Sequence, residues 1–244
     1  MIPMTIDDLF TQAYDRTEVM YGLQPSAELA AYLDQVKPTG SAIDLGAGVG
    51  RNALALARAG LRVLAIDRSA RGLERLQELA ESMGVEDCIE TLSADLRDIE
   101  LPHRAISVVV ATTVLDHLPL QDAIAEWNRM EQSLNDQGVI YAEVHTTEDP
   151  GCRAPPGRNN PFPISETATA VKHYFAAGEL LRLATASGAL RVLRYEERQE
   201  WDYTHGSEHH HGKAVLLAVR SGYYPPWYGH PLAFPRESSR PASS

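Results

Sequence analysis

Cysteine is scarce in this sequence. The 244 residues contain only Cys88 and Cys152, which lie far apart and form no CxxC pair. A disulfide framework and a cysteine zinc site are therefore excluded, and we expect both side chains to be reduced thiols.

Basic residues and long apolar runs are also in short supply. The 22 basic residues against 33 acidic ones give a formal charge of −11, which would repel a phosphate backbone. No apolar run approaches the roughly 20 residues of a membrane span, and the start, MIPMTIDDLF, lacks the charged and apolar regions of a signal peptide. We expect a cytoplasmic protein, monomeric or homodimeric, that binds neither nucleic acid nor membranes.

The remaining composition is that of a globular protein, with 44% hydrophobic and 23% charged residues. We predict one domain over residues 1–220 and a proline-rich, partly disordered tail over 221–244. Within an N-terminal helical flank at 1–40, two helices are expected, separated by Gly22 and Pro25, with Pro25 beginning the second.

Short apolar runs alternate with amphipathic stretches through the middle of the chain. Val108 to Val110 is β-branched throughout, which is typical of a strand buried on both faces. The expected strands are 41–45, 62–66, 88–92, 105–111 and 138–144, and the expected helices are 52–59, 70–83 (capped by Ser69) and 121–134. This order predicts an α/β fold with a parallel sheet.

A stretch rich in proline and glycine, 146–172, follows the last of these strands. Because so long an irregular connection is unusual in a compact domain, we expect it to be functional. After it we predict a helix at 177–187 and strands at 190–198 and 213–220. These two strands, joined by a histidine-rich turn, would add an antiparallel hairpin to the sheet edge.

A glycine-rich turn, IDLGAGVG, joins the first strand to the next helix. Gly46 and Gly48 permit a tight turn and close approach to a ligand, while Gly50 opens a helix whose amides favour a negative group. A dinucleotide fingerprint would have its third glycine where Arg51 stands, and Asp44 precedes the turn. The segment therefore departs from a dinucleotide site.

The run D-L-G-A-G-x-G resembles the first motif of class I S-adenosylmethionine-dependent methyltransferases. The resemblance implies a Rossmann-like, doubly wound sheet of seven strands, mostly parallel with an antiparallel C-terminal hairpin, and helices on both faces. The resemblance is closer to one branch of this family, the tellurite-resistance (TehB-like) methyltransferases, because the chain contains the segments GRNALALARAG and FAAGELLRL. This closer resemblance covers roughly residues 14–200. The implied cofactor is S-adenosylmethionine, with S-adenosylhomocysteine as product.

This resemblance assigns roles to three acids. Asp67 would accept bonds from both ribose hydroxyls, Asp95 would bond the adenine amino group, and Asp44 would orient the methionine ammonium. The full expected cofactor set is Asp44, Gly46, Ala47, Gly48, Gly50, Arg51, Asp67, Arg68, Ala94, Asp95, Leu96 and Thr112.

The acceptor should lie beyond the carboxyl ends of the fourth and fifth strands, where an open α/β sheet binds its ligands. This selects Thr112, Thr113, Asp116, His117 and His145. An anionic acceptor needs no base, whereas a neutral hydroxyl or protonated amine needs a proton acceptor, with His117 our first candidate and His145 our second. Alternatively, both histidines only donate structural hydrogen bonds, and Asp116 caps the following helix.

Four histidines gather in WDYTHGSEHHHGKAV. His209 and His211 would share one face of an extended segment, with His205 returning to them across the turn. We expect no metal, but His205, His209 and His211 form a possible site, and a solvated polar hairpin is a further alternative. The interpretation we favour is that these histidines, with Arg153 and Arg158, recognise a polar or anionic acceptor.

Aromatic residues and histidines complete the expected acceptor pocket. Tyr14, Tyr21, His173 and Tyr174 would close it, with ordinary aromatic packing as the alternative. The expected substrate-binding set is Tyr14, Tyr21, His117, Arg153, His173, His209 and His211.

The sequence thus predicts a methyltransferase acting on an oxygen, nitrogen or sulfur atom of a small molecule, or on an oxyanion such as tellurite or selenite. A non-catalytic sensor of S-adenosylmethionine or S-adenosylhomocysteine is the alternative. A nucleic-acid or protein-amide N-methyltransferase is disfavoured, because TTVLDHLP lacks the Asn/Asp-Pro-Pro-aromatic run of those enzymes.

Overall fold

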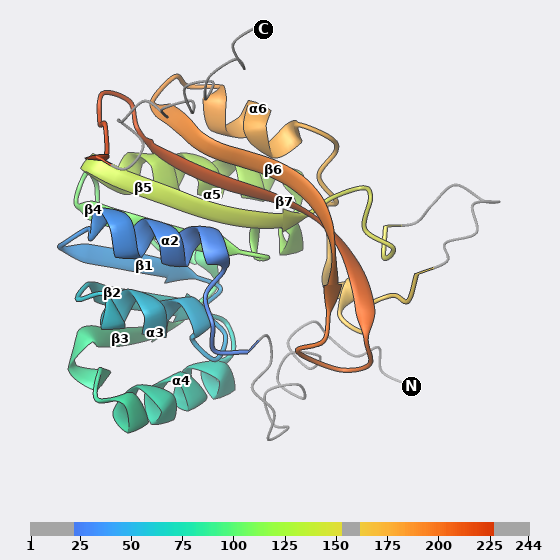
Figure 1. Cartoon of the computed structure of the whole chain (residues 1–244), viewed down its shortest axis with the longest axis horizontal. Coiled ribbons are helices and arrows are strands. Elements are labelled where there is room, and N and C mark those ends of the chain that lie inside the picture. The colour runs from blue at the N-terminus through green and yellow to red at the C-terminus, as the bar shows by residue number, and fades with distance from the viewer. Residues whose placement is uncertain (1–21, 153–161, 227–244) are drawn as a thin grey trace, which may run out of the picture.

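The computed structural model describes residues 22–152 and 162–226, which build one seven-stranded sheet in the order β3-β2-β1-β4-β5-β7-β6 (Figure 1). Strands β1 to β5 are parallel, and β7 runs antiparallel to both β5 and β6. The strands are β1 (Ser41–Leu45), β2 (Arg62–Asp67), β3 (Ile89–Ser93), β4 (Ile106–Thr112), β5 (Leu134–His145), β6 (Leu190–Asp202) and β7 (His209–Arg220). The predicted fold class is confirmed.

Helices cover both faces of this sheet. They are α2 (Ala27–Val36), α3 (Arg51–Arg58), α4 (Ala70–Met83), α5 (Leu120–Ser133) and α6 (Glu179–Thr185), with single 3-10 turns at Glu86–Cys88, Leu96–Asp98, Leu115–His117 and Ala168–Ala170. As predicted, the Ser69 side chain caps α4 by accepting a hydrogen bond from the Gly72 amide. None of the helices in the described ranges is long and apolar enough to cross a membrane.

Alternation along the strands divides the core into two layers. On one face, residues such as Val108 and Val110 pack against α2, α3 and α4. On the other, Val109 and its neighbours pack against α5, through Trp127 and Met130, and against α6. Trp127 and Met130 are buried core residues. The middle strands are apolar on both faces because helices cover them on both sides.

The C-terminal hairpin is longer than the sequence predicted. We expected a polar turn through residues 199–212, but β6 continues to Asp202 and β7 begins at His209, opposite it. Pairing across the hairpin accounts for the extension, since each added residue of one strand finds a partner on the other. The far half of the hairpin consequently bends past the rest of the sheet (Figure 1).

The N-terminal flank also differs in detail. Helix α2 begins at Ala27 rather than at Pro25, with Ser26 in the N-cap position. The first predicted helix, most of the tail and part of the proline-rich segment lie outside the described residues.

Candidate active site

The glycine-rich turn leaves β1 and enters α3 in left-handed backbone conformations. Gly46, Gly48 and Gly50 have φ of 71°, 54° and 91°. A Cβ at Gly46 would lie 2.7 Å from a methyl carbon of Val114, so the turn contacts the segment that follows β4. Only glycine fits this combination of dihedral and close approach.

Asp44 lies at the base of this turn and is fully buried. Its Oδ2 atom has no hydrogen-bond partner among the described residues. Burial raises the pKa of Asp44 to about 7, although a bond from the Ala53 amide and the charge of Arg51 oppose the rise. A buried carboxylate oxygen of this kind is suited to receive a cationic donor from a ligand.

Asp67, at the end of β2, holds the turn in place. Its carboxylate accepts hydrogen bonds from the amides of Gly48 and Ser69, both at 2.8 Å. Burial raises the pKa of Asp67, and these two bonds oppose the rise. The acid therefore has a structural role in the loop, and its carboxylate retains lone pairs for further donors.

Asp95, after β3, is engaged by an arginine that sequence reasoning missed. Arg97 donates from Nε and a terminal nitrogen to the two carboxylate oxygens, at 2.9 and 2.7 Å. This fork lowers the pKa of Asp95 to about 2. Arg68 lies 3.6 Å from the same carboxylate. Asp95 is thus a fixed anion, and any ligand donor must share it with Arg97.

The chain turns sharply where β4 ends. Thr112 accepts a hydrogen bond at 3.0 Å from the side chain of Asn52, on the first turn of α3. Thr113 has φ of 48°, which is strained for a β-branched residue, and its amide donates to the Glu143 carbonyl at 2.9 Å. Strain of this kind is often found at functional sites.

Asp116 and His145 form a buried pair between the ends of β4 and β5. The Asp116 carboxylate contacts Nδ1 of His145 and accepts the His145 backbone amide at 3.0 Å. Burial alone would raise the pKa of Asp116, but the two neighbouring histidines, His145 and His117, bring it down to about 2. The alternative that Asp116 caps the next helix is wrong, since α5 has Pro119 at its N-cap and no side-chain cap.

His117 lies beside this pair. Its ring centroid is 6.5 Å from that of His145, with the rings edge to face. Burial lowers the pKa of His117, which keeps the ring neutral near pH 7. Both candidate bases are therefore at the same edge of the sheet as the glycine-rich turn.

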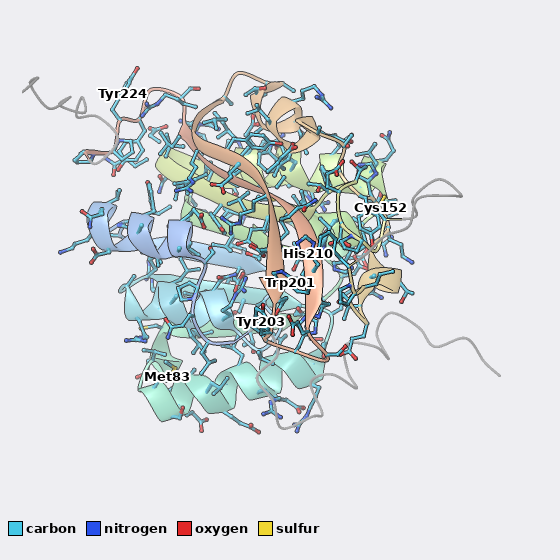
Figure 2. All side chains as sticks on the ribbon, turned by 45° about the vertical axis from the view of Figure 1, so that its right-hand side comes forward. Met83, Cys152, Trp201, Tyr203, His210 and Tyr224 are labelled. Carbon is cyan, nitrogen blue, oxygen red and sulfur yellow. The ribbon has the colours of Figure 1, made fainter. Side chains whose placement is uncertain are left out.

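The histidines of the hairpin are buried, which contradicts the alternative of a solvated turn. The exposed fractions of His205, His209 and His211 are 5%, 1% and 4%. Their neighbour His210 points the other way, stacking on Phe162 at 4.3 Å and meeting Trp201 at 5.2 Å. Figure 2 shows His210 with Trp201 and Tyr203 on the hairpin.

The buried histidines continue the Asp116–His145 pair into the hairpin. The His145 and His211 rings lie 4.7 Å apart, as do those of His211 and His209. Sequence reasoning missed two acids here: Asp149 accepts from Nδ1 of His211 at 2.9 Å, and Asp202 lies 3.9 Å from Nε2 of His211. The strand pairing of Asp202 with His209 would have indicated the second acid, had the hairpin length been known.

The other predicted residues are more peripheral. His173 pairs with Glu179 at 2.9 Å, and Tyr174 donates to the Ala168 carbonyl at 3.3 Å. Arg51, Arg68, Ala94 and Leu96 flank the acids described above, and Ala47 is buried in the turn. Tyr14, Tyr21, Arg153 and Arg158 lie outside the described residues.

Comparisons with known proteins place this geometry in context. The profile of a family described as "Methyltransferase domain" matches residues 42–138. The cypemycin N-terminal methyltransferase of Streptomyces sp is 25% identical over 213 residues, covering 82% of this chain and 81% of that protein.

Solved structures show the same fold. TehB from Haemophilus influenzae superposes with a TM-score of 0.61 at 20% identity, over 89% of this chain and 68% of that one. The magnesium protoporphyrin IX methyltransferase of Synechocystis PCC 6803 was solved with bound S-adenosylhomocysteine. It superposes with a TM-score of 0.57 at 17% identity, over 88% of this chain and 86% of that one.

Proposed function

Because this chain is a class I S-adenosylmethionine-dependent methyltransferase, we propose that it methylates a small molecule at a nucleophile that must lose a proton. The observation that carries this proposal is the Asp116–His145 pair beside the glycine-rich turn. We also propose that residues 1–220 form the single methyltransferase domain. The alternative of a non-catalytic sensor is not favoured, since both the family profile and the cypemycin relative are methyltransferases.

The residues around the glycine-rich turn fit the donor. Asp44 offers a buried, unsatisfied oxygen to the methionine ammonium, and Asp67 offers its remaining lone pairs to the ribose hydroxyls. Asp95 would share its carboxylate between Arg97 and the adenine amino group. We propose the cofactor set predicted from the sequence, from Asp44 through Thr112, as the donor site. When bound there, the sulfonium supplies the methyl group.

We propose that His145 receives the proton from the acceptor. Asp116 holds its Nδ1, which leaves Nε2 as the basic nitrogen. The acceptor proton would pass to Nε2 as the acceptor takes the methyl group that the bound donor would supply. This arrangement favours His145 as the base, because Asp116 both contacts its ring and accepts its backbone amide.

The charges at this edge favour a neutral or cationic acceptor over an oxyanion. Two carboxylates, those of Asp116 and Asp149, contact His145 and His211 beside the proposed base. Tellurite or selenite would be repelled by them, whereas a hydroxyl or an amine would not. The name of the cypemycin relative supports a second candidate acceptor, the amino terminus of a peptide.

The test uses tag-free protein and methyl-labelled S-adenosylmethionine. Mass spectrometry follows transfer to primary amines, hydroxyl compounds, thiols, tellurite, selenite and a peptide with a free amino terminus. We expect methylated amine or hydroxyl products that His145→Gln no longer forms. Methylation of oxyanions alone, at rates that His145→Gln leaves unchanged, would overturn the proposal.

A further inference from the structure

The tip of the β6–β7 hairpin carries four side chains whose ligand atoms converge. Asp202, His205, His209 and His211 each offer an oxygen or nitrogen, and these atoms all lie within 4.8 Å of one another. Three of the four are imidazoles that are almost completely buried. Carboxylate and imidazole are ligands that divalent ions of the zinc type accept.

The hydrogen bonds of the two central histidines fix which nitrogen bears the proton. Nδ1 of His209 lies 2.7 Å from the Ser207 carbonyl, which can only accept, so this nitrogen carries the hydrogen. Nδ1 of His211 lies 2.9 Å from the Asp149 carboxylate and is the donor for the same reason. In each neutral ring the lone pair therefore lies on Nε2.

These two lone pairs face each other. The Nε2 atoms of His209 and His211 are 3.0 Å apart, a distance at which two lone pairs repel unless a proton or a metal ion lies between them. With metal–ligand distances of about 2.0–2.1 Å, neighbouring ligands of a tetrahedral ion are about 3.3 Å apart. The Asp202 oxygen lies 3.7 Å from His205 and 3.9 Å from His211, too far for hydrogen bonds but near this spacing.

The outer contacts are also those of a metal site. Metal-bound histidines usually donate their second nitrogen to a carboxylate or a carbonyl, as His211 and His209 do here. Asp149 is itself held by the amides of Gly151 and Gly212, at 2.7 and 3.2 Å. A second group of possible ligands, His145, Asp149 and His211, is less suitable because these hydrogen bonds already occupy Asp149.

We propose that Asp202, His205, His209 and His211 bind one divalent ion of the zinc type. Four protein ligands fill a tetrahedral shell, so the ion fixes the hairpin tip in the way a structural zinc does. Through His211 and Asp149 it also fixes the segment that leaves β5, next to His145. The site does not depend on the acceptor proposed above.

The experiment measures metal on full-length, tag-free protein. Elemental analysis after dialysis against zinc gives the stoichiometry, and titration with zinc against a chromophoric chelator gives the affinity. Cobalt replacement reports the coordination through its visible spectrum. We expect one ion per chain, bound with the spectrum of a four-coordinate site, and no comparable binding of magnesium or calcium.

Variants separate this site from adventitious binding. His209→Gln and Asp202→Asn should weaken zinc binding by at least about 100-fold, and Asp149→Asn by about 10- to 100-fold. His210→Phe is the matched control, because His210 lies on the same strand but faces Phe162. His103→Gln, at an exposed position, is the second control. Both controls should bind zinc as the unaltered protein does.

The proposal is overturned if the unaltered protein retains no zinc, or if His209→Gln and His210→Phe retain it equally. Circular dichroism of each variant establishes that it is folded. If His209→Gln does not fold, Asp149→Asn decides: unchanged zinc affinity in that variant also overturns the proposal.

Discussion

His209 and His211 direct their Nε2 atoms at each other across 3.0 Å inside the β6–β7 hairpin. His211 in turn contacts Asp149, from the segment that follows β5, and its ring lies 4.7 Å from that of His145. Contacts therefore run without interruption from the hairpin tip to the proposed catalytic base. What stabilises the hairpin should also stabilise the acceptor side of the site.

Zinc should raise the thermal stability of the protein. An ion that binds only the folded state, present at 100 times its dissociation constant, raises the free energy of unfolding by about 2.7 kcal/mol. We expect a concentration-dependent rise in Tm that a chelator reverses. The Tm of His209→Gln should not respond to zinc, whereas that of His210→Phe should; an equal response in both would contradict the prediction.

The fold and the donor side of the site were predictable because their signals are local. The turn from Asp44 to Gly50 and the acids that end β2 and follow β3 occupy a few adjacent residues each, and the alternation of strands and helices positions them. The hairpin was not predictable in the same way. Asp149 meets a residue 62 positions away, and that contact depends on how far β7 extends past β5.

The role of Asp116 was likewise not predictable from the sequence, because it depends on a contact with a residue far along the chain. Before a helix, an aspartate is commonly a cap, and sequence alone left that role open. The structure turns its side chain toward His145, because the end of β5 lies beside the end of β4 in the sheet.

Asp67→Ala should strongly weaken donor binding. The substitution removes the proposed bonds to the ribose and also those to the amides of Gly48 and Ser69. Loss of two charge-assisted bonds to the ribose, each of about 1.5–3 kcal/mol, predicts a dissociation constant at least about 100-fold higher in calorimetry. Asp98→Ala, at an exposed position nearby, should bind the donor normally. Retained binding in Asp67→Ala would refute the assignment of the donor site.

Donor affinity should fall below pH 7. Burial raises the pKa of Asp44 to about 7 in the free protein, so protonation at lower pH removes the charge that pairs with the ammonium. Each pH unit below the pKa then weakens binding by up to about tenfold. Calorimetry across the pH range around 7 should show this dependence. The Asp44→Asn variant should bind the donor weakly, with an affinity that changes little with pH. A pH-independent affinity in the unaltered protein would argue against the pairing.

Gly50→Ala should destabilise the fold more than Gly60→Ala. Both glycines have positive φ, 91° and 89°, so both substitutions incur the same backbone strain. A Cβ at Gly50 would lie 2.1 Å from Leu76, whereas none of the described atoms lies within 4 Å of one at Gly60. Urea unfolding should show that Gly50→Ala lowers the free energy of unfolding by about 1–3 kcal/mol more than Gly60→Ala does. Equal losses would mean that α4 does not pack closely on this turn.

Asp116→Asn should lower kcat without changing donor affinity. The amide cannot hold His145 in the tautomer that leaves Nε2 basic, and general-base catalysis contributes about 10²- to 10⁴-fold. His145→Gln should lower kcat similarly. His117→Gln is the matched comparison, since that ring lies beside the pair and its loss should lower kcat far less. If His117→Gln lowers kcat and His145→Gln does not, the proton passes to His117, and Asp116 serves only to position the end of β5.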